Sequence, residues 1–158
     1  MAAGARPIII SSRDAKLARA REFGAFGTVN YRTNPEWQDE VRALTANAGV
    51  SQVLDVGGRE TLPKALQALG FGGHIALIGG LSGFASAMPV SSFIGLGASV
   101  TGIYVGSRAD FEAMNSFIGE HQLRPIIDRV FSFEKAPAAY DYMASGAHLG
   151  KIVISLGQ

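Results

Sequence analysis

The sequence predicts an α/β protein with a Rossmann-like, doubly wound parallel sheet. Two observations predict it: short apolar runs alternate with segments of helical spacing, and several of the apolar runs end in glycines. Strand–helix alternation at this spacing is typical of parallel strands joined by right-handed helical crossovers. With 158 residues, 47% of them hydrophobic and 17% charged, the chain has the composition of a domain with a buried sheet.

The first part of the chain reads as alternating strands and helices. Apolar, β-rich runs predict the strands, and apolar residues three to four apart, such as Trp37, Val41 and Leu44, predict the helices. Gly24 is expected to end the first helix as a C-terminal cap. The expected strands are residues 6–11, 28–31, 52–58, 74–80 and 99–106, and the expected helices are residues 14–23, 35–45 and 62–69.

The pattern changes after residue 106. Residues 81–96 are small and apolar and are expected to be irregular, and a helix over 109–121 follows the fifth strand. Its residues Phe111, Met114, Phe117 and Ile118 are expected to face inward. A half-exposed strand over 126–133, a helix over 136–144 and a terminal strand over 152–156 complete the chain.

Composition excludes several classes of function. The net charge of +1 gives no electrostatic basis for binding nucleic acid or a membrane surface. The absence of cysteine excludes disulfides, thiolate catalysis and cysteine-ligated zinc, so no zinc is expected to be bound by this chain. No signal peptide is visible, and the apolar runs are shorter than the roughly 18 residues of a membrane span. We therefore expect a cytoplasmic protein.

Ligands of open parallel sheets bind beyond the carboxyl ends of the strands. Three of the five expected strand ends are rich in glycine, which lets a planar ring or a ribose approach the backbone. Each glycine pair alone is explained as well by a tight turn, but the three together favour a bound ligand. The residues expected at these ends are Ser11, Ser12, Arg13, Tyr31, Val56, Gly57, Gly58, Gly79, Gly80, Leu81, Tyr104, Val105 and Gly106.

The end of the first expected strand indicates which dinucleotide is bound. Sites for NAD usually place a carboxylate there, which accepts hydrogen bonds from the adenosine 2′-hydroxyl. In this chain Ser11 and Ser12 hold that place. Two cations, Arg13 and Lys16, follow directly, and Tyr31 ends the adjoining strand. Hydroxyls and cations suit a 2′-phosphate, so NADP(H) is favoured over NAD(H).

Other polar residues carry weaker signals. Ser12 is alternatively an N-cap and Asp14 a partner of the helix dipole. His74, His121 and His148 lack the spacing of metal ligands and are expected to be structural or at the surface. Asp55 lacks the acidic pair of a receiver domain and is expected to stabilise a turn. Ser82 lacks the G-x-S-x-G elbow of a hydrolase.

A series of motifs resembles the medium-chain dehydrogenase/reductase superfamily, which comprises zinc-dependent alcohol dehydrogenases and zinc-free quinone oxidoreductases. They are Ser-Ser-Arg-Asp-Ala-Lys-Leu-Ala-Arg-Ala-Arg-Glu-Phe-Gly-Ala (11–25), Val-Asn-Tyr-Arg (29–32), Val-Leu-Asp-Val-Gly-Gly (53–58), Gly-Gly-His-Ile-Ala-Leu-Ile-Gly (72–79) and Gly-Lys-Ile-Val-Ile (150–154). The resemblance implies contacts of Lys16 and Tyr31 with a 2′-phosphate, and of Lys151 with a cofactor phosphate. It also implies that Gly79, Gly80, Leu81, Tyr104 and Val105 bracket the nicotinamide.

The chain departs from that family's pattern at its start. The family's N-terminal half, with its zinc ligands or substrate pocket, and its first Rossmann strand with the G-x-G-x-x-G turn are missing. That strand would lie between the first and third strands expected here. Its absence leaves both of them without a hydrogen-bonding neighbour on one side. Three outcomes are open: the sheet closes up, a partner chain fills the gap, or the isolated chain is unstable.

These observations predict a partial NAD(P)-binding Rossmann domain over residues 1–106 and a segment of the catalytic domain over 107–158. The parent enzyme would transfer hydride between NADPH and an alcohol, carbonyl or quinone, and no catalytic residue is assigned in this chain. The alternative is a non-catalytic module that binds nucleotide or dimerises through exposed strands. A methyltransferase is a third interpretation, which the Ser-Ser-Arg cluster does not support. From the resemblance, residues 99–105 are expected either to pair across a homodimer or to form a plain edge strand.

Overall fold

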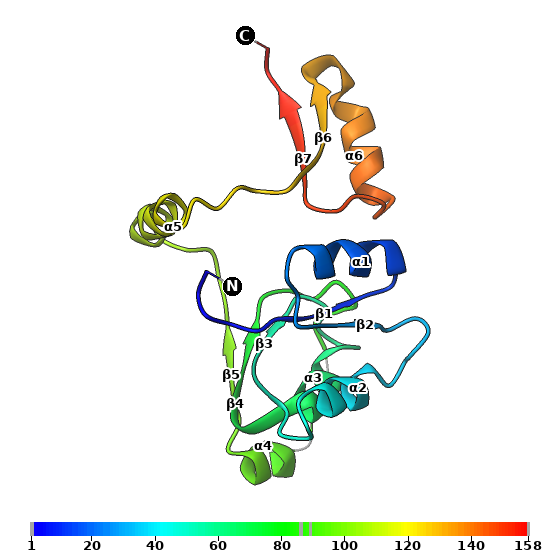
Figure 1. The fold of residues 1–158 in the computed structure, drawn as a ribbon, viewed down its shortest axis with the longest axis vertical. Helices are drawn as coiled ribbons and strands as arrows, with labels where there is room; N and C mark the ends of the chain where they lie inside the picture. Colours follow the sequence, from blue (N-terminus) through cyan, green and yellow to red (C-terminus); the bar gives the residue numbers. More distant parts are fainter. Residues whose placement is uncertain (1, 86, 89, 158) are drawn as a thin grey trace. The chain divides into compact units, whose positions relative to one another are not determined.

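The structure is a computed structural model that describes residues 2–85, 87–88 and 90–157. The chain divides into two compact units, Met1–Val105 (unit 1) and Gly106–Gln158 (unit 2), and each is described here by itself (Figure 1). Within the described ranges, no helix is both long enough and apolar enough to cross a membrane.

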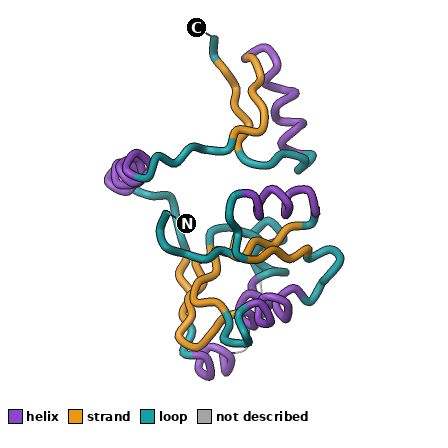
Figure 2. The backbone as a smooth tube through the Cα atoms, in the orientation of Figure 1, coloured by secondary structure: helices purple, strands orange, loops and turns teal. Residues whose placement is uncertain are grey.

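Unit 1 alternates strands and helices, as the sequence predicts (Figure 2). Its elements are β1 (Ile8–Ser11), α1 (Asp14–Glu22), β2 (Gly27–Asn30), α2 (Trp37–Leu44), β3 (Val50–Asp55), α3 (Leu62–Ala68), β4 (Leu69–Leu77), α4 (Val90–Leu96) and β5 (Ser99–Gly102). Gly24 follows the C-cap of α1 with a φ of +90°, a conformation that glycine adopts without a steric penalty. The predicted end of the first helix is therefore confirmed.

The strands of unit 1 form two parallel sheets. One sheet pairs β1 with β2, and the other has the order β3–β4–β5. Over the part of the chain that the structure describes, β1 and β3 do not pair with each other, so the sheet does not close up. The predicted fold class, an incomplete Rossmann-like parallel sheet, is confirmed.

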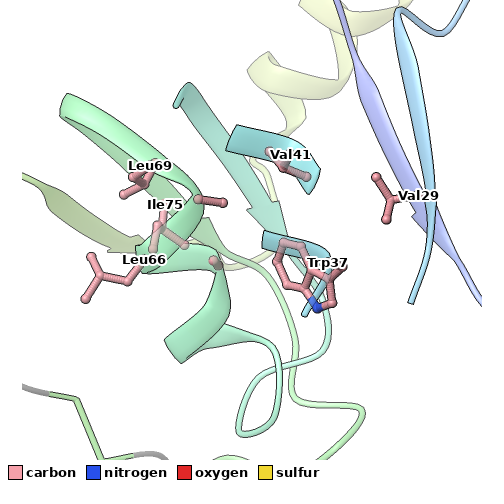
Figure 3. Close-up of a cluster of buried hydrophobic side chains, with 8 residues drawn as sticks. Val29, Trp37, Val41, Leu66, Leu69 and Ile75 are labelled. Atoms are coloured by element: carbon pink, nitrogen blue, oxygen red, sulfur yellow. The ribbon is translucent and has the colours of Figure 1, made fainter. Parts of the chain in front are cut away.

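One hydrophobic core serves both sheets of unit 1. Trp37 and Val41 lie on the buried face of α2, and Val29 of β2 belongs to the same cluster (Figure 3). On the other side, Leu69 and Ile75 of β4 are fully buried. Because α2 also contacts α3, these two helices connect the packing of the two sheets. The further members of the cluster are Ala65, Leu66 and Ala68.

Two expectations about unit 1 were wrong. The region 81–96 contains a helix, α4, which the sequence did not predict because its Ser, Gly and β-branched residues have low helix propensity. Phe93 and Leu96 pack against the core, and tertiary contact stabilises the helix. Strand β4 begins at Leu69, five residues before the predicted start, because Leu69 pairs with Val50 ahead of an irregularity in the register.

Unit 2 contains α5 (Arg108–Glu120), β6 (Ile127–Ser132), the short 3-10 helix η1 (Phe133–Lys135), α6 (Ala136–Ala144) and β7 (Lys151–Ser155). Strands β6 and β7 are parallel, and α6 packs against both. No residue of α5 is buried, and Phe111, Met114 and Phe117 are exposed. The expectation that Phe111, Met114 and Phe117 face inward is therefore wrong, because apolar residues at helical spacing become buried only where another element packs against them.

Asp128 ties the end of α6 to the start of β7. Its carboxyl group accepts hydrogen bonds from the Tyr142 hydroxyl, at 2.8 Å, and from the Leu149 amide, at 2.9 Å. The Leu149 amide and then the Tyr142 hydroxyl hold the pKa of Asp128 below its usual value. The Arg129 guanidinium lies 4.2 Å from the centre of the Tyr142 ring. This cluster fixes the turn before β7.

Candidate functional site

Most of the residues predicted to bind a cofactor lie at the carboxyl ends of the strands of unit 1. Two groups form there. The polar cluster, after β1 and β2, comprises Ser11, Ser12, Arg13, Lys16 and Tyr31. The glycine cluster, after β3 and β4, comprises Val56, Gly57, Gly79, Gly80 and Leu81.

The polar cluster is built on adjacent strand ends. The Tyr31 amide donates to the Ser11 carbonyl oxygen at 3.1 Å, which places the two residues side by side. Arg13, in extended conformation, is the N-cap of α1, and no side chain caps this helix. The alternative prediction that Ser12 is the N-cap is therefore wrong.

Asp14 has a structural partner within this region. Its carboxyl group accepts a hydrogen bond from the Asn30 side-chain amide at 2.7 Å. The Asn30 side-chain oxygen in turn accepts from the Arg32 amide at 3.0 Å. Asp14 therefore links the start of α1 to the end of β2, in addition to the helix-dipole role that the sequence predicts.

In the glycine cluster, the two loops after β3 and β4 run alongside each other. The Leu81 amide donates to the Val56 carbonyl oxygen at 3.2 Å, and the Ser82 amide donates to the Gly57 carbonyl oxygen at 2.8 Å. The Ser82 hydroxyl also donates to the Gly57 carbonyl oxygen, at 2.8 Å. Backbone pairing of the two strands thus continues beyond Asp55 and holds the loops in one arrangement.

Asp55 organises the loop after β3. Its Oδ1 atom accepts hydrogen bonds from the amides of Gly57 and Gly58, at 2.7 and 3.0 Å, and from the Thr61 hydroxyl, at 2.7 Å. The side chain is buried, and its Oδ2 atom has no hydrogen-bond partner. The prediction that Asp55 stabilises a turn is confirmed. The roles of Thr61 and Ser82 were missed, although the spacing of Asp55, Gly58 and Thr61 was a signal for the first of them.

Packing between the two loops accounts for two of the glycines. Gly58 has a φ of +82°, and a Cβ atom there would lie 2.5 Å from the Gly83 carbonyl oxygen. A Cβ atom on Gly79 would lie 3.0 Å from the Val56 carbonyl oxygen. Packing of the protein itself therefore requires glycine at position 58 and favours it at position 79, so the presence of these glycines alone is no evidence for a ligand.

The surface around the glycine cluster is apolar and open. Leu81 is 88% exposed and Tyr104, just after β5, is 90% exposed, while Val56 and Val105 are also exposed. An open pocket of about 200 Å³ lies between the segments that follow β3 and β4. It is lined by Gly58, Arg59, Leu62, Leu77, Ile78, Gly79, Gly83 and Phe84.

Other candidate residues lie elsewhere. Lys151 begins β7 in unit 2. His74 joins three strands, because its ring nitrogens contact the Gln52 side chain at 2.9 Å and the Thr101 hydroxyl at 3.0 Å. Across residues 2–85, 87–88 and 90–157, no group of three or more His, Asp or Glu side chains is placed to hold a metal ion.

Comparison with known proteins identifies the family of this chain. Residues 1–120 match the family model of zinc-binding dehydrogenases. A zinc-type alcohol dehydrogenase-like protein of Schizosaccharomyces pombe is 36% identical over 99% of this chain and 46% of its own length. A 2-haloacrylate reductase of Burkholderia is 30% identical over 96% of this chain and 48% of its own length.

Solved structures agree with this result. A crystal structure of an NAD-dependent alcohol dehydrogenase matches 98% of this chain and 45% of its own, at 32% identity and a TM-score of 0.87. The chain belongs to the zinc-binding dehydrogenase family of the medium-chain dehydrogenase/reductase superfamily. It spans about half the length of the relatives that it matches.

Proposed function

We propose that unit 1 binds a nicotinamide dinucleotide as the cofactor-binding part of an oxidoreductase, with NADPH preferred over NADH. The observation that carries the proposal is the position of the two clusters. Both lie at the carboxyl ends of parallel strands, where open α/β sheets bind ligands.

The polar cluster suits the adenosine end of NADPH. The Arg13 guanidinium and the Lys16 ammonium carry the positive charge that a 2′-phosphate needs, and the Ser12 hydroxyl is not used as a helix cap. Asp14, the acidic residue nearest to them in sequence, is held by Asn30. Tyr31 is 45% exposed, beside Ser11, and its hydroxyl is a further donor to a phosphate.

The glycine cluster suits the nicotinamide end. Its loops are fixed by Asp55 and Ser82, and the exposed side chains of Val56, Leu81 and Tyr104 offer apolar surface to a planar ring. Val105 adds to this surface. When bound, the cofactor supplies the hydride chemistry, and the residues of this chain hold and orient it. Unit 2 belongs to the catalytic domain in this proposal, and the phosphate contact of Lys151, the first residue of β7, stays a prediction.

The parent enzyme in this proposal moves hydride between NADPH and an alcohol, a carbonyl compound or a quinone. The relatives support the class of reaction, because they include alcohol dehydrogenase-like proteins and a quinone oxidoreductase-like protein. A non-catalytic module is the second candidate. The observation that favours it is β5, a strand at the edge of its sheet with all four residues exposed, which is open to pairing in a homodimer.

Fluorescence titration of the chain with NADPH and NADH tests the proposal. We expect saturable binding with NADPH bound more tightly. Arg13→Glu should weaken NADPH binding by about ten-fold or more, because a charge-assisted hydrogen bond contributes about 1.5–3 kcal/mol, and should change NADH binding much less. Arg21→Glu, at the other end of α1, is the matched control and should leave both affinities unchanged. Equal affinities for both cofactors would refute the NADPH preference, and a folded chain that binds neither would favour the module.

A further inference from the structure

The turn that follows β4 is closed by its own backbone. The Gly83 amide donates to the Gly80 carbonyl oxygen at 2.9 Å, so Leu81 and Ser82 occupy the two central positions of a β-turn. Leu81 is 88% exposed, so burial of its side chain does not hold it in place. Its position therefore depends on the hydrogen bonds that attach this turn to the rest of unit 1.

Backbone hydrogen bonds attach the turn to the segment after β3 at two places. The Leu81 amide donates to the Val56 carbonyl oxygen at 3.2 Å. In the opposite direction, the Arg59 amide donates to the Gly83 carbonyl oxygen at 2.9 Å. These two bonds flank Ser82, which lies between Leu81 and Gly83 in the turn.

The Ser82 side chain joins the two segments between these bonds. Its hydroxyl oxygen accepts a hydrogen bond from the Glu60 amide at 2.9 Å, and its O–H group donates to the Gly57 carbonyl oxygen at 2.8 Å. The Ser82 amide donates to the same carbonyl oxygen, also at 2.8 Å. Because a hydroxyl group both donates and accepts, this one side chain serves two separate backbone groups of the segment after β3. Alanine at this position serves neither of them.

The same contacts fix the peptide group between Gly57 and Gly58. Its carbonyl oxygen accepts from the hydroxyl and the amide of Ser82. Its N–H group, that of Gly58, donates to the Asp55 carboxyl group at 3.0 Å. Because glycine has no Cβ atom, a peptide group between two glycines can turn over at a lower steric cost than others. Ser82 and Asp55 therefore hold this peptide group from both sides in one orientation.

We propose that Ser82 is the positioning residue for the nicotinamide end of the dinucleotide site. Its side chain keeps the turn against the segment after β3, and the turn keeps Leu81 where it meets one face of the nicotinamide ring. This inference deepens the proposed function and rests on it. The Ser82 proton is used within the protein, on Gly57, so the hydroxyl group acts on the ring through Leu81 and not by contact. Its loss should therefore affect NADPH and NADH alike.

Calorimetric titration of the full 158-residue chain tests this role with three ligands. They are NADPH, NADH and adenosine 2′,5′-bisphosphate, which carries the adenosine end and the 2′-phosphate but no nicotinamide. Ser82→Ala should weaken the binding of NADPH and of NADH by about five-fold or more, because two hydrogen bonds that hold the binding arrangement are lost. The affinity for adenosine 2′,5′-bisphosphate should change by less than about two-fold, because this ligand does not reach the turn.

Two further variants separate positioning from a general loss of structure. Ser82→Thr keeps a hydroxyl group and should restore the affinity for NADPH to within about three-fold of the wild type, because both hydrogen bonds can form again. Ser91→Ala removes the hydroxyl group of an exposed serine on α4 and should leave all three affinities unchanged. A general loss of structure would instead weaken the binding of all three ligands together.

Hydrogen exchange follows the same turn without any cofactor. In Ser82→Ala the Glu60 amide loses its acceptor, whereas the Leu81 amide keeps the Val56 carbonyl oxygen. Exchange of the Leu81 amide that is faster by about five-fold or more therefore reports that the turn separates from the segment after β3, and not only that one bond is missing. The emission of Trp37, the single tryptophan and a core residue, should show that the variant is folded.

Four outcomes would overturn the role of Ser82 and leave the proposed function standing. In Ser82→Ala they are unchanged exchange of the Leu81 amide, unchanged affinity for NADPH, and equal losses of affinity for NADPH and adenosine 2′,5′-bisphosphate. The fourth is a Ser82→Thr variant that binds NADPH as weakly as the alanine variant. A wild-type chain that binds none of the three ligands would refute the proposed function itself, and the positioning role with it, so the two failures are distinguishable.

Discussion

Replacement of Asp55 by alanine should destabilise unit 1 by about 3 kcal/mol. The side chain is only 4% exposed, and its Oδ1 atom accepts three hydrogen bonds, from Gly57, Gly58 and Thr61. A hydrogen bond contributes about 1 kcal/mol net to stability, and donors left unpaired by the substitution add a desolvation cost. The loop after β3 is the one that pairs with the loop after β4, so the glycine cluster should lose its order as well.

Urea unfolding followed by the emission of Trp37 measures this effect, because Trp37 lies in the core of unit 1. Asp55→Asn is the matched control. It retains an oxygen that accepts the same three hydrogen bonds, but it places an amide NH2 group where the buried Oδ2 atom has no partner. We expect the asparagine variant to lose less stability than the alanine variant, because the donors of Gly57, Gly58 and Thr61 keep their acceptor. An alanine variant within about 1 kcal/mol of the wild type would refute the argument, as would an asparagine variant as unstable as the alanine variant.

Two further predictions concern the core and unit 2. Leu69→Ala should lower the free energy of unfolding by about 2–5 kcal/mol in the same urea assay, because Leu69 is fully buried. Phe71→Ser, at an exposed neighbouring position, is the control and should change it by less than about 0.5 kcal/mol. Similar losses in both variants would contradict the assigned core. The Leu149 amide and the Tyr142 hydroxyl lower the pKa of Asp128. Ionised Asp128 therefore contributes stability to unit 2 above the usual pKa of an aspartate, and this contribution is lost as the pH falls through the lowered pKa. Asp128→Asn should therefore flatten the acid dependence of amide exchange in β6 and β7, and an unchanged profile would contradict this assignment.

The sequence predicted the fold through features that are local along the chain. Glycine after a helical segment identified the end of α1, and the spacing of Trp37 and Val41 identified the buried face of α2. These two features depend on backbone geometry and periodicity, which a single sequence contains. The lack of a common neighbour for β1 and β3 was instead predicted from the resemblance to the medium-chain dehydrogenase/reductase superfamily.

Features that depend on tertiary contacts were not accessible in this way. Helix α4 forms from residues of low helix propensity because Phe93 and Leu96 find a place on the core. In the glycine cluster, the contact between Gly58 and the loop at Gly83 joins segments far apart in the sequence. The glycines were correctly marked as special positions, but their cause, the packing of one loop on another, is visible only in three dimensions.

Helix α5 has a consequence for the order in which the chain folds. Ser107 and Asp110 form a capping box, in which the Asp110 amide donates to the Ser107 hydroxyl and the Asp110 carboxyl group accepts from the Ser107 amide. Arg108 and Glu112 add an ion pair one turn apart. All of these contacts lie within six residues and none requires a distant part of the chain, so they lower the cost of nucleating the helix. Helix α5 can thus begin to form from its own local contacts, before β6 and β7 of unit 2 have paired.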